Sequence, residues 1–242
     1  MDVYANRNGY RACMRAEGLV YFRVTEGETD LYIGAQKDLS REALEAVKDI
    51  RARVSGIIEK RPMFRRSLAP LDPFGDEDAW LMKMYRAGRT AGTGPMAAVA
   101  GMIAEYTGRA LLPLSPEIVV ENGGDVFLAG MHRRTVAIAA GQSPLSGRLG
   151  LTVMPGPGFS VCTSSGTYGH SLSFGKADAA VVAAGDAALA DAVATMLGNK
   201  CKNEQCLAEA AQWAAALPGV SGAVAVMGDK LAAAGQIELT AL

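Results

Sequence analysis

The spacing of apolar residues changes several times along this chain, and each change limits what the chain can fold into. Residues 19–24 and 29–33 have the composition and alternation of strands, and Gly27 breaks the pattern between them. From Ser40, a good helix N-cap, apolar residues follow at steps of three and four, which predicts a helix that ends at Pro62. The apolar face of this helix consists of Leu44, Val47, Ile50, Val54 and Ile57.

The rest of the chain continues this mixture of strands and helices. Strand candidates lie over residues 118–120, 125–128, 135–139, 149–153, 181–182, 224–226 and 237–239. Helices are predicted over residues 78–87, from Pro95 to a cap at Gly108, from a cap at Asp186 to Leu197, and over residues 204–217. Runs of strands with interspersed helices predict an α+β fold of mixed sheets packed with helices. Residues 29–54 and 179–197 both read strand, turn and helix, which suggests an internal duplication, and no linker divides residues 1–242 into more than one domain.

Composition excludes several classes of protein. The 242 residues are 50% apolar and carry a formal charge of −1, so the chain is not disordered and has no global attraction for nucleic acid. The sequence contains no run of 18 or more uncharged apolar residues, which is the length that a membrane-spanning helix needs. The first residues lack the pattern of an export signal, and we therefore expect a cytoplasmic protein with reduced thiols.

A paired glycine lies between two strand candidates in the sequence Asn122-Gly123-Gly124-Asp125. Such glycines let a backbone come close to a ligand and present N–H groups to an anion, while the flanking Asn and Asp add polar side chains. The alternative is an ordinary two-glycine hairpin turn with turn-favouring neighbours. Both interpretations stay open on the sequence.

A second polar cluster follows an apolar strand and begins Thr163-Ser164-Ser165-Gly166. Hydroxyls and backbone N–H groups in such a loop can bind a phosphate or a carboxylate. The loop continues to His170, one of only 2 histidines, which could move a proton or orient an oxygen. The alternative is a polar turn that satisfies its own backbone.

Asp191 and Thr195 are four residues apart in a predicted helix, so both project from the same face. A carboxylate and a hydroxyl together are hard oxygen ligands that suit Mg²⁺, with waters and a phosphate completing the shell. Alternatively, the hydroxyl bonds back to the helix backbone and the carboxylate is solvated. Cys201 and Cys206 lack the ligand spacing of a zinc site and are interpreted as ordinary thiols.

Taken together, these motifs resemble the ApbE superfamily in order and spacing, and are most similar to a branch classed as an uncharacterised protein family. Further blocks carry the resemblance over nearly the whole chain, namely residues 29–31, 94–101, 120–125, 162–166 and 170–178. ApbE proteins are FAD:protein FMN transferases that use Mg²⁺ to attach FMN to a Thr or Ser of a target protein. The resemblance implies an ApbE-like, T-fold-related architecture.

The resemblance also implies roles for particular residues. The Gly-Gly-Asp turn, here Gly123, Gly124 and Asp125, would help to hold a flavin nucleotide, and Asp191 and Thr195 would ligate Mg²⁺. The transferases carry a His-x-x-Asp-Pro-x-Thr-Gly segment after the Thr-Ser-Gly loop, and here that stretch reads Ser171-Leu172-Ser173-Phe174-Gly175-Lys176.

This departure favours a binding or accessory protein that takes a small anionic or phosphorylated ligand. The family's connection to sulfur assimilation and homocysteine formation suggests that such an accessory protein would act in that metabolism. The alternative is a Mg²⁺-dependent flavin transferase that uses FAD. A third, structural hypothesis has the Ala-rich residues 204–217 bury themselves against a second copy, which would make the protein a homo-oligomer.

Overall fold

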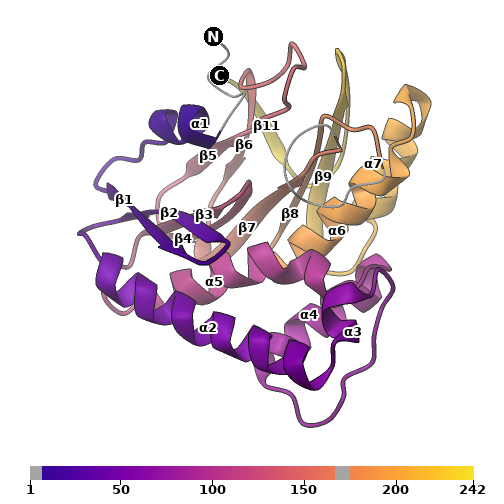
Figure 1. Cartoon of the computed structure of the whole chain (residues 1–242). Helices are drawn as coiled ribbons and strands as arrows, with labels where there is room; N and C mark the ends of the chain where they lie inside the picture. The colour runs from indigo at the N-terminus through magenta and orange to yellow at the C-terminus, as the bar shows by residue number, and fades with distance from the viewer. Residues whose placement is uncertain (1–6, 167–174) are drawn as a thin grey trace.

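A computed structural model describes residues 7–166 and 175–242 of the chain. It confirms the α+β prediction: strands form two antiparallel sheets, and the larger sheet is covered by helices (Figure 1). The larger sheet has the strand order β1-β2-β3-β4-β7-β8-β9-β10, and the smaller has the order β11-β6-β5. The strands of the larger sheet are β1 (Val20–Glu26), β2 (Thr29–Ala35), β3 (Ile118–Asn122), β4 (Asp125–Gly130), β7 (Gly156–Ser164), β8 (Ala179–Ala184), β9 (Val220–Met227) and β10 (Lys230–Gly235). Those of the smaller sheet are β5 (Arg134–Ala137), β6 (Leu149–Val153) and β11 (Glu238–Ala241).

The main helices gather on one face of the larger sheet, while helix α1 and the smaller sheet lie on the other side (Figure 1). The longer helices are α2 (Ser40–Lys60), α4 (Ala79–Ala91), α5 (Val99–Leu111), α6 (Ala187–Lys200) and α7 (Leu207–Ala215). The short ones are α1 (Arg7–Cys13), α3 (Met63–Arg66) and the 3₁₀ turns η2 (Pro95–Ala98) and η3 (Glu204–Cys206). Both strand-helix units suggested by the sequence are present, as β2 with α2 and β8 with α6.

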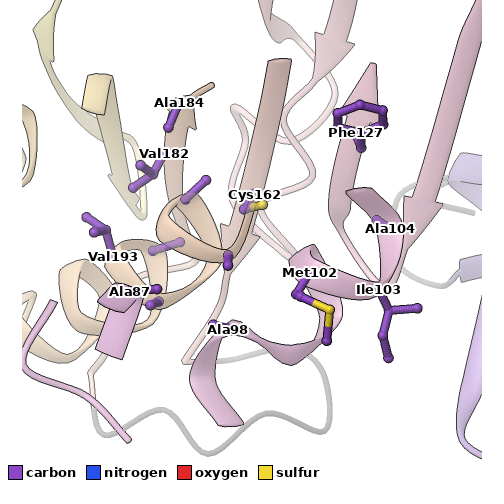
Figure 2. Close-up of a cluster of buried hydrophobic side chains, with 14 of the residues drawn as sticks. Ala87, Ala98, Met102, Ile103, Ala104, Phe127, Cys162, Val182, Ala184 and Val193 are labelled. Atoms are coloured by element: carbon purple, nitrogen blue, oxygen red, sulfur yellow. The ribbon is translucent and has the colours of Figure 1, made fainter. Parts of the chain in front are cut away.

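Strands β3, β4 and β8 are buried at every position, because both faces of the sheet are covered at its centre. On the helix side, Phe127 and Cys162 join Met102, Val182 and Val193 in the larger core (Figure 2). On the opposite side, alternate residues of the same strands build smaller cores against β5 and β6.

Helix α6 is rich in alanine, has most of its residues buried, and packs against α4, α5 and the sheet. The residues concerned are Ala187, Ala188, Ala190, Ala192 and Ala194. Small side chains let helices approach closely, so this segment packs within the chain as a central helix.

Two local expectations about helix caps were wrong. Ser40 does not cap α2, because the N-cap is Leu39 and the Ser40 N–H instead contacts Asp38. Gly108 does not end its helix but lies inside α5, where a Cβ atom would be 2.3 Å from Phe127. The helix predicted over residues 204–217 is confirmed, as the 3₁₀ turn η3 followed by α7.

Candidate functional site

The paired glycines form the two-residue turn between β3 and β4, with Asn122 paired to Asp125. Both have positive φ, +66° at Gly123 and +106° at Gly124. Two positive φ values in a two-residue hairpin match the right-handed twist of the strands, and residues other than glycine adopt them at a cost. The hairpin interpretation is therefore correct for the backbone, and the turn also lines a cavity described below.

Glu121 holds this turn in place, a role that was not predicted from the sequence. The Gly124 N–H donates to Glu121 Oε1 over 2.9 Å, and the Tyr10 hydroxyl donates to the same oxygen over 2.6 Å. Arg11 Nε donates to Glu121 Oε2 over 2.6 Å, and the Arg11 guanidinium also pairs with Asp30. Because Glu121 takes the Gly124 N–H, that donor is occupied within the protein. In the sequence, the indication of this role was that Glu121 is a lone carboxylate at the end of an apolar strand.

The Thr-Ser-Ser segment lies beside the turn, because β7 pairs with β4 and ends next to it. The Thr163 N–H donates to Asp125 Oδ1 over 3.3 Å, and a Cβ on Gly124 would lie 3.5 Å from the Thr163 carbonyl oxygen. The Ser164 hydroxyl is buried and has no hydrogen-bond partner among the residues that the structure describes. Gly166 is held by its N–H, which donates to the Ala177 carbonyl over 2.9 Å. His170 lies outside the described residues, so its predicted role stays a prediction.

A cavity of about 630 Å³ opens between the larger sheet, α1 and β5. At one end it is lined by five of the predicted residues, Gly123, Gly124, Thr163, Ser164 and Ser165. Its walls are formed by Tyr10, Cys13, Met14, Arg15, Ala16, Tyr21, Val119, Glu121, Val126, Leu128, Arg134, Thr135, Val136, Ala137 and Ala139. This volume falls in the range of small-molecule sites, which combine apolar walls with a few placed polar groups.

Asp125 and Asp191 form a pair of carboxyl groups on the helix side of the turn. Burial, and after it the nearby carboxyl of Asp191, raises the pKa of Asp125 well above its usual range. Burial raises the pKa of Asp191 to about 7, although hydrogen bonds from the Gly101 and Ala100 backbone lower it. Neither carboxyl pairs with a Lys, Arg or His side chain within the described residues. Asp125 is buried and Asp191 is half-buried. Two neighbouring carboxyls that are shielded from water and lack a cation share protons or bind a metal ion.

Helix α6, which carries Asp191, is fixed at its first residue by a buried carboxylate. Glu105 Oε2 accepts a hydrogen bond of 3.0 Å from the Ala187 N–H. Its Oε1 accepts from Lys83 over 2.8 Å and from Arg109 over 2.7 Å. The completely buried Glu105 therefore ties α4, α5 and α6 together below the carboxyl pair.

Three further predicted or considered residues lie near the pair without lining the cavity. The Asn122 side-chain amide donates to the Ala100 carbonyl over 2.9 Å, which ties the hairpin to the start of α5. Thr195 lies one helical turn after Asp191 on α6, as the spacing predicted. Cys162 is buried, its Sγ contacts the Ala187 carbonyl at 3.6 Å, and burial raises the pKa of its thiol well above the usual range, so it is not a reactive thiolate.

The structure thus brings the Gly-Gly turn and the Thr-Ser-Ser segment together at one end of the larger sheet, with Asp125 and Asp191 behind them. Across the residues described, no group of three or more His, Cys, Asp or Glu side chains could hold a metal by itself. Cys201 and Cys206 are free thiols, as expected. A metal at Asp125 and Asp191 would therefore need hydroxyl, water or ligand oxygens as well.

Comparison of the fold with solved structures defines the class. The chain aligns over 91% of its length with 98% of the flavin transferase ApbE from Vibrio cholerae, H257G mutant, with a TM-score of 0.60 and 13% identity. The ApbE protein from Thermotoga maritima gives a TM-score of 0.53 and 14% identity over 88% of this chain and 96% of that one. The fold is therefore that of ApbE proteins.

Sequence comparison then gives the family. A family profile described as "AbpE bacteria" matches residues 11–234, and the chain belongs to this family. A UPF0280 protein from Methanocella arvoryzae is 38% identical over 212 residues, which cover 87% of this chain and 86% of that protein. A UPF0280 protein from Methanopyrus kandleri is 38% identical over 223 residues, covering 88% of this chain and 90% of that protein. The resemblance stated from the sequence is thereby confirmed.

Across the described residues, the structure has no helix that combines the length and the apolar character needed to cross a membrane.

Proposed function

We propose that this protein binds a phosphorylated ligand of nucleotide type at the Gly-Gly end of the cavity, together with Mg²⁺ at Asp125 and Asp191. The observation that carries the proposal is the carboxyl pair beside the turn, in which Asp125 is buried and Asp191 is half-buried, and which has no cationic side chain as partner among the described residues. An unpaired buried carboxylate is unfavourable, and a divalent cation would compensate both members of the pair.

The donor set fits Mg²⁺ by its chemistry. Two carboxylates and the Thr195 hydroxyl are oxygen ligands, and Mg²⁺ is commonly held by one or two carboxylates together with substrate phosphates and waters. When bound there, the ion would neutralise charge on the phosphate oxygens. The protein's own groups would orient the carboxyls through the Gly101 N–H and the Thr163 N–H.

The phosphate would be received by polar groups at the Gly-Gly end of the cavity. Gly124 is bound to Glu121, so the candidates are the Gly123 N–H and the hydroxyls of Thr163 and Ser164. Ser164 supports this most directly, because its hydroxyl is buried without a partner in the described part of the chain. An anion there would supply the missing hydrogen bond. The apolar walls of the cavity would enclose the rest of the ligand.

Flavin transfer is a second candidate, favoured by the fold that this chain shares with flavin transferases over most of its length. In that reaction, an acceptor Ser or Thr oxygen forms a bond to the phosphorus of the FMN half of FAD. The phosphoanhydride bond breaks, AMP leaves, and the acceptor proton passes to a base, a role that the sequence analysis assigned to His170. The absence of the Asp-Pro-x-Thr-Gly segment favours ligand binding without transfer.

Calorimetric titration tests the proposal. FAD, FMN and ADP are titrated into metal-free protein with and without Mg²⁺, using wild type, Asp191→Asn and, as a control, Asp229→Asn, which changes an exposed carboxylate paired with Lys230. We expect at least one probe to bind wild type and Asp229→Asn in a Mg²⁺-dependent manner and to lose that dependence in Asp191→Asn. Equal binding to all three proteins would contradict the metal assignment, and absence of binding to wild type would contradict the ligand class.

Incubation of FAD with a Ser- or Thr-containing acceptor protein then separates binding from transfer, because only transfer leaves FMN covalently attached to the acceptor. The connection to homocysteine formation stays a prediction. Growth of a deletion strain without methionine would contradict it.

A further inference from the structure

The end of the cavity away from the Gly-Gly turn carries a second polar group that the proposed function does not use. Arg134, on the outer strand β5, lines the cavity, and its side chain is 13% exposed. Its Nη2 donates to Glu117 Oε2 over 3.0 Å. Glu117 is itself held, because its Oε1 accepts from the Met131 N–H over 2.7 Å and contacts His132 Nδ1 at 2.8 Å. The guanidinium is thus fixed in place by a carboxylate at the cavity wall.

Strand geometry places Arg134 far from the phosphate-binding end. Glu117, which holds Arg134, precedes β3 by one residue, and Gly123 follows β3 by one, so the levels of Glu117 and Gly123 are six residues apart along this strand. At about 3.3 Å per residue, the two levels are about 20 Å apart. Inorganic phosphate can occupy only one end of such a cavity, whereas an elongated ligand can reach both.

The wall between the two ends is apolar. Residues alternate along β3 and β4, so Val119, Val126 and Leu128 all face the cavity between the turn and Arg134. Tyr21 joins this wall, with burial raising the pKa of its hydroxyl and the nearby Arg134 guanidinium partly offsetting that rise. Such a surface suits a ring system, with polar groups confined to the two ends of the ligand.

Among the residues that the structure describes, few partners occupy the N–H donors of Arg134. Within residues 7–166 and 175–242, Glu117 is the acceptor that its guanidinium contacts, through Nη2. Arginine carries five N–H donors and no acceptor, so the remaining donors can be satisfied only by oxygen or nitrogen acceptors of a ligand or by water. A rigid, planar fork of donors selects for a carbonyl pair, a carboxylate or a phosphate.

We propose that Arg134 is a specificity-determining residue, whose guanidinium donates hydrogen bonds to acceptor atoms at the far end of an elongated ligand. This inference rests on the proposed function, in which the phosphate end of the same ligand is bound at the Gly-Gly turn. The ligand class is thereby narrowed to phosphorylated compounds that carry a ring system with carbonyl, carboxylate or phosphate oxygens at their other end. FAD has such oxygens on its flavin ring, whereas the adenine of ADP carries none.

The test compares FAD with ADP in calorimetric titrations with Mg²⁺, using wild type, Arg134→Gln, Arg134→Lys and Arg133→Gln. Arg133 is the matched control, because it is the neighbouring arginine, is exposed, and pairs with Glu238 outside the cavity. We expect Arg134→Gln to weaken FAD binding at least tenfold and to leave ADP binding within twofold of wild type. Arg134→Lys keeps the charge beside Glu117 but loses the planar fork, so an intermediate loss for FAD is expected. Thermal melts of all four proteins establish that they are folded.

Each other outcome overturns the inference in a recognisable way. Unchanged FAD binding in Arg134→Gln would overturn it while leaving the proposed phosphate site intact. An equal loss of affinity for FAD and for ADP would show that the substitution acts through overall charge or structure, and not through hydrogen bonds to the far end of the ligand. If wild type binds none of FAD, FMN and ADP with Mg²⁺, the proposed function fails, and the inference fails with it.

Discussion

The side-chain oxygen Oδ2 of Asp191, on α6, accepts a hydrogen bond of 2.9 Å from the backbone N–H of Gly101 on α5. This approach is possible because Gly101 has no side chain. A Cβ atom there would lie 2.4 Å from the Ala187 carbonyl oxygen and 2.9 Å from the Asp191 Cβ. The orientation of the carboxyl group therefore depends on a glycine in a different helix.

Gly101→Ala should push α5 and α6 apart, because the atoms that the new methyl group would meet include backbone. We expect a loss of about 2–3 kcal/mol in the free energy of unfolding, as for other overpacked cores. Gly56→Ala is the control, since Gly56 lies inside α2 and a Cβ there meets nothing within 4 Å. It should be neutral or stabilising by about 0.5–1 kcal/mol. Urea denaturation measures both, and equal stability of the two variants would contradict the packing argument.

Asp191→Asn should stabilise the metal-free protein at high pH. Burial raises the pKa of Asp191 to about 7, whereas an unfolded aspartate titrates near 4. Between these values the folded state binds more protons than the unfolded state, so this group's contribution to stability falls as pH rises from about 4 to 7. The asparagine side chain does not titrate, and we expect the Tm of this variant to exceed that of wild type by about 3 °C or more at pH 8 and to match it at pH 4–5.

Thermal melts across pH, in chelator and in Mg²⁺, check this difference. In Mg²⁺ at pH 8, wild type should recover the lost stability, because the ion binds the ionised carboxyls of Asp125 and Asp191. The Asp191→Asn variant lacks one of these carboxyls, so its Tm should change less when Mg²⁺ is added. A Tm difference that does not change with pH would contradict the elevated pKa.

The turn glycines are expected to differ in what they tolerate. Gly123 has φ +66°, in the left-handed region that asparagine enters more readily than alanine or valine. Gly123→Asn should therefore cost less than about 1 kcal/mol, while Gly123→Val should cost roughly 2 kcal/mol. Chemical denaturation of the two variants tests the order, and a Val variant as stable as the Asn variant would show that the turn relaxes to another conformation.

Glu105→Gln should be among the most destabilising polar substitutions. Glu105 is fully buried and is bound by Lys83, Arg109 and the Ala187 N–H, so the neutral amide removes the carboxylate from both cations, and of the two Lys83 still pairs with Asp186. Because both cations reach the surface, the loss should be about 2–3 kcal/mol, below that of a fully buried pair. Glu45→Gln changes an exposed helix pair with Arg41 and should cost less than about 0.5 kcal/mol. Similar losses in the two variants would contradict the anchoring role of Glu105.

Thiol labelling should follow burial. Cys13 is exposed, whereas Cys162 and Cys201 are buried, and burial raises the pKa of Cys201 to about 11. Timed alkylation of the folded protein, read by mass spectrometry, should modify Cys13 first and leave Cys162 and Cys201 unmodified until the protein unfolds. Early modification of Cys162 would contradict its assignment as a buried, unreactive thiol.

Local pattern was sufficient for most of the fold. The period of Leu44 to Ile57 predicted α2, and Asp186 was correctly assigned as the cap of α6, where its carboxylate accepts from the Leu189 N–H. Gly108 was misassigned because a glycine near the end of an apolar run is typical of a C-cap, whereas here it makes room for the Phe127 ring. That reason lies in a strand distant in sequence, and no local pattern could reveal it.

The sequence predicted the small residues of the candidate site but not the charged residues that hold or line its cavity. The Gly-Gly turn and the Thr-Ser-Ser segment carried recognisable motifs, and the structure places both at one cavity. The roles of Glu121 and Arg134 could not be predicted, because each depends on partners, Arg11 and Glu117, supplied by other elements of the fold. The proximity of Asp125 and Asp191 likewise arises only when α6 packs against the sheet.

The pairing of the smaller sheet has a consequence for biosynthesis. Strand β5 forms the outer wall of the cavity and pairs with β6, whose other edge is covered by β11 (Glu238–Ala241). During synthesis on the ribosome, every strand of the larger sheet emerges before β11 does. The large sheet can therefore assemble while the cavity wall is still incomplete. We expect nascent chains that lack β11 to be compact yet unable to retain a ligand.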